Sequence, residues 1–386
     1  MNQIYRLEKD EIQELLEFDE SIKVTFTMPI QQEVDKRDEN RIRLKNLLQD
    51  AEQMLIALEF RTPVIEDLLA PANQLIGGTR FLDLSSPGLA LFLAEGVFYL
   101  FQLPFEVAET VVAAPNFQIK SLMPLRNVGA YYILNLSQNN VRLLYATEHT
   151  SERVNISDMP QSLDEALRWD DPESQLQWHS QTGQTGNGRA AMFHGHGGAN
   201  KETHKQDLLR YFQLLDQGIS RILVNETAPL ILSGVDYLLP IYRQANSYQY
   251  LLDQDLTGSQ EHLSDAEIHQ KTWPLVQEHF REERNTAVSR YHQMAAQELA
   301  TANLEAVLTA AYQGRVDTLF VATDRQIWGS YDPQTGRAQQ NDEWQPGDGD
   351  LLNLATILTV KYDGDVFAGP QDKMHTEEPL AAIFRF

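Results

Sequence analysis

The chain has 386 residues, of which 42% are hydrophobic and 22% charged, a balance typical of a globular protein with two or three domains. It contains no cysteine, which excludes disulfide frameworks, thiolate zinc sites and cysteine nucleophiles and indicates a reducing compartment. Its formal net charge of −24 excludes a generally basic surface and favours solubility.

The amino-terminal segment, MNQIYRLEKDEIQELLEF, is charged and has no apolar signal-peptide core. No apolar run reaches the ~18 residues that a membrane span needs. We therefore expect a soluble, cytoplasmic protein with no membrane or DNA partner. The sequence predicts no particular oligomeric state.

Residues 1–122 have the pattern of a mixed helix and strand domain. In the helix expected over residues 40–58, leucines and an alanine form one apolar face, and Arg37, Arg41 and Lys45 follow at four-residue spacing on another. We interpret this basic stripe as a solvated face, with Arg41 and Lys45 as candidate RNA contacts. The other expected elements are a helix over 8–18, a strand over 22–28, a helix over 63–75, a β-hairpin over 89–104 turning at Glu95-Gly96, and a strand over 108–114.

Residues 123–260 restart the pattern with a strand meander. AYYILNLS, NVRLLYAT and RVNIS predict three strands joined by short polar turns. APLILSGV is a continuous apolar run, typical of a buried strand. The remaining predicted elements are a helix over 163–169, a strand over 175–180, a helix over 200–217 and a helix over 235–245.

Residues 261–386 alternate between helices and strands. Ser264 and Glu267 match a capping box, and the helix that follows should kink or break at Trp273-Pro274. Asn303 and Gly314 mark the start and stop of the next helix. The pattern continues with a strand over 316–322, a polar loop rich in proline and glycine, a helix over 351–362 and a strand over 380–386. We expect a mixed α/β fold with three domains, over residues 1–122, 123–260 and 261–386.

The segment GRAAMFHGHGGANKETHKQDLLRYF, residues 188–212, is the main functional candidate. It lies at the end of a window, from Ser174 through Lys201, that contains no Asp or Glu. At the average of 55 acidic residues in 386, about four would be expected there. Arg189, His194, His196 and Lys201 are therefore candidate RNA contacts, because acidic side chains do not oppose a phosphate backbone in this window.

Four kinds of catalytic site fit this segment poorly. His194, His196 and His204 do not have the spacing of a helix-borne zinc pair. A P-loop would need glycine where Asn200 stands and a hydroxyl where Glu202 stands. A two-metal nuclease would need carboxylates on the first two strands of the meander, which have none, and a G-x-S-x-G elbow is absent. We expect no metal and no cofactor.

The remaining interpretation is that the backbone of this segment, rather than its side chains, contacts a ligand. Gly197 and Gly198 allow conformations that other residues resist and allow close approach to their N–H groups. The helix expected directly after them would favour an anion at its start. A flexible surface linker is the alternative interpretation.

The chain resembles the archaeo-eukaryotic type of peptide-chain release factor. It resembles the bacterial relatives of that family more closely. The segments that carry the resemblance are RIRLKNLLQDAEQML, LALFLAEGVFYLFQLP, YYILNLSQNNVRLL, AAYQGRVDTLFVATD and LAAIFRF. The resemblance implies a release-factor-like N-domain, an RNase-H-like middle domain and an α/β/α C-domain similar to kink-turn-binding ribosomal proteins. It also implies the ribosome or tRNA as a partner.

In that family a Gly-Gly-Gln loop before a long helix promotes hydrolysis of peptidyl-tRNA. Gly197 and Gly198 match its glycines, but Ala199 stands where the glutamine would be. The sequence GSQ at 258–260 is elsewhere in the chain order, and we regard it as coincidence. The family's cysteine-containing decoding segment is absent, and IKS at 119–121 falls outside the expected helical hairpin, so we expect no stop-codon recognition.

Three functional hypotheses follow. The chain is a ribosome-associated factor that hydrolyses peptidyl-tRNA in ribosome rescue, with residues 194–200 as its tip. Alternatively, it is a non-catalytic interaction module on the same scaffold, or an enzyme that uses the histidine cluster on a small molecule or with a metal.

Overall fold

The computed structural model describes residues 12, 14–16, 22–33, 36–77, 86–127, 129–148, 150–170 and 199–386. The chain divides into two compact units. Unit 1 combines Met1–Val128 with Glu283–Phe386, and unit 2 is Gly129–Glu282. Within the described residues, no helix is both long and apolar enough to span a membrane.

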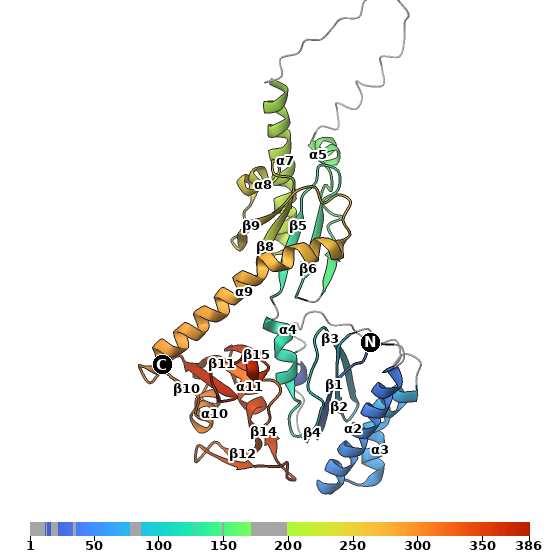
Figure 1. Cartoon of the computed structure of the whole chain (residues 1–386), viewed down its shortest axis with the longest axis vertical. Helices are drawn as coiled ribbons and strands as arrows, with labels where there is room; N and C mark the ends of the chain where they lie inside the picture. The colour runs from blue at the N-terminus through green and yellow to red at the C-terminus, as the bar shows by residue number, and fades with distance from the viewer. Residues whose placement is uncertain are drawn as a thin grey trace, which may run out of the picture. The chain divides into compact units, whose positions relative to one another are not determined.

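The amino-terminal part of unit 1 is a four-stranded antiparallel sheet with two helices on one face (Figure 1). Successive side chains of each strand point to opposite faces of this sheet. Val24, Phe26 and Met28 contact the helices, whereas Ala90 and Phe92 belong to the core on the opposite face. The sheet has the order β3-β2-β1-β4 and comprises β1 (Lys23–Pro29), β2 (Gly88–Ala94), β3 (Val97–Leu103) and β4 (Thr110–Ala114), with helices α2 (Arg37–Ala57) and α3 (Thr62–Gly77).

The carboxy-terminal part of unit 1 contains a mixed sheet and a smaller antiparallel one. The mixed sheet has the order β10-β16-β11-β15, with β11 (Val316–Ala322) parallel to β15 (Asp365–Gly369). The other elements are β10 (Ala300–Thr301), β16 (Leu380–Phe384), α10 (Leu304–Tyr312), α11 (Leu351–Lys361), the short helix η4 (Gln371–Lys373), and the sheet of β12 (Trp328–Asp332), β13 (Arg337–Asn341) and β14 (Gly349–Asp350).

These two parts of unit 1 share one hydrophobic core. Phe92 and Phe117 from the first part lie in the same cluster as Leu308 and Leu351 from the second. The segment between the first sheet and unit 2, formed by η3 (Ile119–Leu122) and α4 (Met123–Asn127), packs against α11 and β15. Neither part therefore buries all of its apolar surface alone.

A buried ion pair crosses this shared core. Lys120 Nζ lies 2.7 Å from Asp350 Oδ2, and Lys120 also donates to the carbonyl oxygen of Arg325. Asn353 completes the junction, because its side chain accepts from the Lys120 backbone N–H and donates to the Phe117 carbonyl. Lys120, Asp350 and Asn353 are all buried, so these hydrogen bonds lie in a region of low solvent access.

Unit 2 is built around a five-stranded sheet of order β7-β6-β5-β8-β9 (Figure 1). Strands β5, β8 and β9 run parallel, and β6 and β7 are antiparallel neighbours. The strands are β5 (Tyr131–Asn135), β6 (Arg142–Ala146), β7 (Ser151–Val154), β8 (Leu230–Gly234) and β9 (Leu251–Thr257), and the helices are α5 (Leu163–Asp170), α7 (Ala199–Ile222), α8 (Leu239–Ala245) and the start of α9 (Asp265–Ala295).

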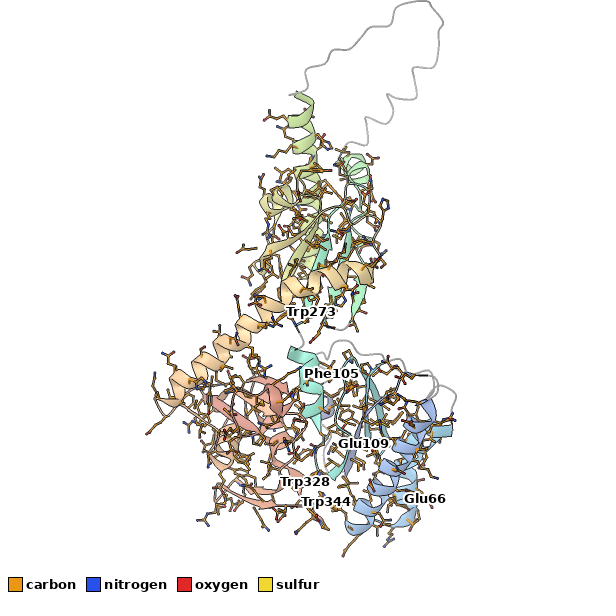
Figure 2. All side chains as sticks on the ribbon, viewed as in Figure 1. Glu66, Phe105, Glu109, Trp273, Trp328 and Trp344 are labelled. Carbon is orange, nitrogen blue, oxygen red and sulfur yellow. The ribbon has the colours of Figure 1, made fainter. Side chains whose placement is uncertain are left out.

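Helices cover both faces of this sheet. Tyr132 and Leu134 pack against α7 and α8, whereas Tyr131 and Ile133 pack against α9. Trp273, labelled in Figure 2, belongs to α9, and its ring lies 6.0 Å from that of Tyr131. The central strands β5, β6 and β8 are therefore buried on both sides, whereas the edge strands β7 and β9 expose polar side chains.

The mixed α/β class expected from the sequence is confirmed, and so are most of the expected elements within the described residues. Of the predicted kink or break at Trp273-Pro274, the break is wrong, because α9 continues through Pro274, and the kink stays a prediction. The polar loop expected after residue 322 contains the β12–β13–β14 sheet, and β9 and β15 were not expected. The predicted strand at 175–180 lies outside the described residues. The three-domain boundaries stay a prediction.

Candidate functional site

The glycine-rich segment precedes α7 directly. Ala199 is the first residue of α7, and Lys201 lies in its first turn. Arg189, His194, His196, Gly197 and Gly198 lie outside the described residues.

Helix α7 is anchored by its later turns. Leu208, Tyr211, Phe212 and Leu215 are buried against the sheet, whereas residues 202–206 are exposed. Burial raises the pKa of Tyr211, and the neighbouring Glu165 raises it further, so the phenol stays protonated at neutral pH. The first turns of α7 are thus available to solvent, while the rest of the helix is fixed.

A polar pocket lies at the carboxyl ends of β5 and β8, where ligands collect in open α/β sheets. Its volume is about 270 Å³, and its lining includes Ser137, Gln138, Tyr237, Gln260 and Glu261. These residues come from three loops, which follow β5, β8 and β9. The pocket is a feature of the sheet edge rather than of one contiguous motif.

Hydrogen bonds connect the rim of this pocket to α7. Gln138 Nε2 donates to the Tyr237 hydroxyl at 2.7 Å and lies 3.4 Å from His204 Nε2. On the other side, Ser137 Oγ and Asn139 Nδ2 donate to Glu261 Oε1 at 2.9 and 3.2 Å. The pocket and the start of α7 therefore lie at the same edge of unit 2.

The strand positions beside the pocket carry no carboxylate. Asn135 on β5 is in register with Arg142 on β6 and Ser233 on β8, and all three side chains are buried. Among the residues that the structure describes, no group of three histidine or carboxylate side chains is placed to hold a metal ion. The arrangement offers hydrogen-bond donors and acceptors, with Glu261 as the charged group of the rim.

The basic stripe on α2 lies in unit 1. Lys45 is exposed and Arg41 is half-buried. Their neighbour Arg43 donates to the Pro29 carbonyl and pairs with Glu109 at 2.9 Å; Glu109 is labelled in Figure 2. Arg41 and Lys45 stay predicted RNA contacts.

The pocket residues were not predicted from the sequence. Gln138 and Tyr237 are separated by 99 positions and meet only because β5 and β8 are adjacent parallel strands. The available signal was the set of polar residues that directly follows each apolar strand. GSQ at 258–260, set aside as coincidence, contributes Ser259 and Gln260 to the pocket.

Comparison with known families bears on this same unit. Residues 131–278 match the model of the bacterial archaeo-eukaryotic release factor family 7. The chain contains a bacterial release-factor-like domain. The matched region holds the whole sheet of unit 2, the acid-free window, α7 and the pocket. The resemblance expected from the sequence is confirmed.

Solved structures similar to the chain include an archaeal translation termination factor, aRF1, at 13% identity, with 100% of both chains covered and a TM-score of 0.27. An archaeal Pelota, in a model of ribosome-bound Pelota and ABCE1, matches at 11% identity over 75% of this chain and 72% of that one, with a TM-score of 0.41. Dom34 of S. cerevisiae matches at 10% identity over the same shares, with a TM-score of 0.38. No curated protein sequence matches the chain.

Proposed function

We propose that this protein is a ribosome- or tRNA-directed factor that hydrolyses peptidyl-tRNA in ribosome rescue, with residues 194–200 as its catalytic tip. The observation that carries the proposal is the release-factor family match, which includes the glycine pair and the helix that begins at Ala199. The family description supports a role in translation.

The chemistry of the tip rests on its backbone. Hydrolysis adds water to the ester carbonyl, which releases the peptide acid and a free tRNA hydroxyl, and negative charge develops on the carbonyl oxygen. Backbone N–H groups of Gly197 and Gly198, together with the positive end of α7, would stabilise that charge. Ala199 provides no side-chain amide, so the attacking water must be oriented by the backbone or by the tRNA.

The charge distribution supports an RNA partner at this tip. A protein of net charge −24 repels RNA over most of its surface, and the acid-free window 174–201 adjoins α7. Contacts to phosphate there would be strongly weakened by salt, because binding releases counterions.

We propose that the protein does not read stop codons. Lys120 of the IKS segment is only 3% exposed and is paired with Asp350, so it does not present its ammonium group to RNA. The sequence contains no cysteine that could match the family's decoding segment.

The test compares hydrolysis of peptidyl-tRNA on stalled ribosomes by the wild-type protein and by Gly198→Pro. Proline removes one N–H and fixes φ, so we expect turnover to fall at least about tenfold, or about 1.4 kcal/mol in the barrier. Gly77→Ala, at an open position at the end of α3, is the matched control and should retain full activity. Failure of the wild type to co-sediment with ribosomes at low salt would contradict the proposal.

The alternative is a non-catalytic interaction module, and Ala199 is the residue that favours it. Ala199→Gln tests it directly, since the longer side chain restores the amide that the family's loop carries. If the wild type binds ribosomes without hydrolysis and Ala199→Gln gains turnover, the module interpretation is correct. Turnover by the wild type that Gly198→Pro abolishes excludes it.

A further inference from the structure

We propose that the pocket at the carboxyl ends of β5 and β8 binds a guanine base of RNA, stacked on Tyr237 and recognised by Gln260 and Glu261. That the base belongs to an RNA rests on the proposed function, whereas the binding of a base is inferred from the pocket. The position of the pocket, the unpaired side-chain oxygen of Gln260 and the exposed ring of Tyr237 each contribute to this assignment.

A buried polar layer lies in the sheet next to the pocket, and its side chains are not part of the pocket lining. Asn135, Arg142 and Ser233 lie side by side in register, at 1%, 7% and 0% exposure. Among the described residues, Asn135 Oδ1, Ser233 Oγ and Gln260 Oε1 are buried without a hydrogen-bond partner. Of these three residues Gln260 lines the pocket, and buried acceptors are normally satisfied by protein, water or a ligand.

Arg142 fixes the segment that carries the recognition residues. Its guanidinium donates to the carbonyl oxygens of Gln260 and Leu263, and it pairs with Asp265 at 2.8 Å. Asp265 also pairs with Arg153 at 2.8 Å, so two guanidinium groups share this carboxylate. The backbone at residues 260–265 is thereby held against β6.

Gln260 and Glu261 then present acceptors from a fixed position. Gln260 lines the pocket and is 5% exposed, and its Nε2 is directed to the Thr257 carbonyl at 3.4 Å. Glu261 is held by the donors Ser137 Oγ and Asn139 Nδ2, and a carboxylate has capacity for further hydrogen bonds. A ligand with adjacent N–H donors satisfies both residues.

Tyr237 supplies the stacking surface. Its side chain is 53% exposed at the rim, and Gln138 anchors its hydroxyl at 2.7 Å, which restricts where the ring can lie. Unstacked RNA bases bind proteins by stacking on such rings and by hydrogen bonds along their edges. The pocket volume of about 270 Å³ leaves room for a base beside this ring.

Guanine is the base that fits an acceptor-rich rim. Its N1–H and N2 amino group are neighbouring donors on one edge, whereas adenine presents an acceptor at N1. A phosphate would be repelled by Glu261. The base would enter beside His204 and Lys205 of α7, which are exposed. Neither side chain carries a negative charge that would repel the phosphate backbone of RNA.

The experiment titrates the full-length protein with guanosine and with guanosine monophosphate, and follows binding by calorimetry or by amide chemical shifts. We expect saturable binding of both, with adenosine monophosphate at least about tenfold weaker (about 1.4 kcal/mol). Tyr237→Ala and Glu261→Gln should each weaken guanosine binding at least about tenfold. Glu152→Gln, an exposed change on β7, is the matched control and should bind like the wild type.

Several outcomes would overturn the proposal. These are no saturable guanosine binding, equal binding of adenosine monophosphate, binding of inorganic phosphate alone with equal affinity, or stronger binding of arginine amide than of guanosine. Thermal unfolding of each variant verifies that its fold is intact. Ribosome co-sedimentation is measured separately, so a protein that binds ribosomes but not guanosine refutes this inference and leaves the proposed function standing.

Discussion

At the residue scale, Lys120 is the group on which the junction within unit 1 depends. Its ammonium group contacts Asp350, whose other oxygen accepts from the backbone N–H groups of Ile327 and Leu352. Asp350 is 2% exposed and is the N-cap of α11, so one carboxylate joins the ion pair to the start of a helix. Loss of the lysine would leave that charge buried and uncompensated.

We predict that Lys120→Met destabilises unit 1 by about 3–5 kcal/mol, the usual cost of removing one partner of a buried ion pair. Denaturant unfolding followed by amide exchange in residues 86–127 and 299–386 measures this loss. Lys45→Met, on the exposed face of α2, is the control and should change stability by no more than about 0.5 kcal/mol. A loss below about 1 kcal/mol for Lys120→Met would show that the junction is held by apolar packing alone.

At the element scale, the sequence predicted elements wherever a local signal decides the structure. The β2–β3 hairpin turns at Glu95-Gly96 as expected, with Gly96 at φ +72°. It did not predict β9, whose Asp253 and Gln254 are exposed at the edge of the sheet, or the polar β12–β13 hairpin. Such strands are specified by their neighbours rather than by their own hydrophobic pattern.

The start of α9 is an element boundary that a short sequence motif predicts. Ser264 Oγ accepts from the Glu267 N–H, and Glu267 Oε2 accepts from the Ser264 backbone N–H at 2.8 Å, which is the expected capping box. The hydrogen bonds that Ser264 donates to Glu267 hold the pKa of this carboxyl below its ordinary value. A carboxyl with a lowered pKa stabilises the fold at neutral pH, and this contribution is lost as pH falls through the folded-state value.

We predict that Ser264→Ala lowers the stability of unit 2 by about 1 kcal/mol at neutral pH, the usual cost of losing an N-cap. The difference from the wild type should shrink as the pH falls through the lowered folded-state pKa of Glu267, because the carboxylate then becomes protonated. Thermal unfolding at several pH values measures it. Ser289→Ala, inside the same helix, should lie within about 0.5 kcal/mol of the wild type. A cap effect that stays constant down to pH 3 would contradict the role of Glu267.

At the scale of the whole molecule, unit 1 is built from two separated stretches of chain, and the sequence did not show this. The apolar pattern of residues 86–127 predicts strands, but not that Phe92 and Phe117 pack in one cluster with Leu308 and Leu351. The pocket was missed for the same reason, because chain order does not reveal which loops meet at one edge of a sheet. Both features arise from contacts between residues far apart in sequence.

We predict that residues 129–282 fold cooperatively when expressed alone, whereas residues 1–128 alone expose the unshared half of their core and bind a hydrophobic dye. Adding residues 283–386 to residues 1–128 should abolish dye binding and restore amide protection, since the two stretches complete one unit. Adding residues 129–282 instead is the control and should leave dye binding unchanged. A cooperative, dye-free fold of residues 1–128 alone would refute the shared core.

The shared core of unit 1 also sets the order of folding during synthesis. Domains generally fold as they emerge from the ribosome, at about 5–20 residues per second. Unit 2 is complete once Glu282 has emerged, but unit 1 must wait for the 104 residues from Glu283 to Phe386, which takes roughly 5–20 s at that rate. The stretch made first is therefore the last to reach its native packing. During that interval Phe92 and Phe117 lack their partners, which makes the nascent chain a candidate for chaperone binding.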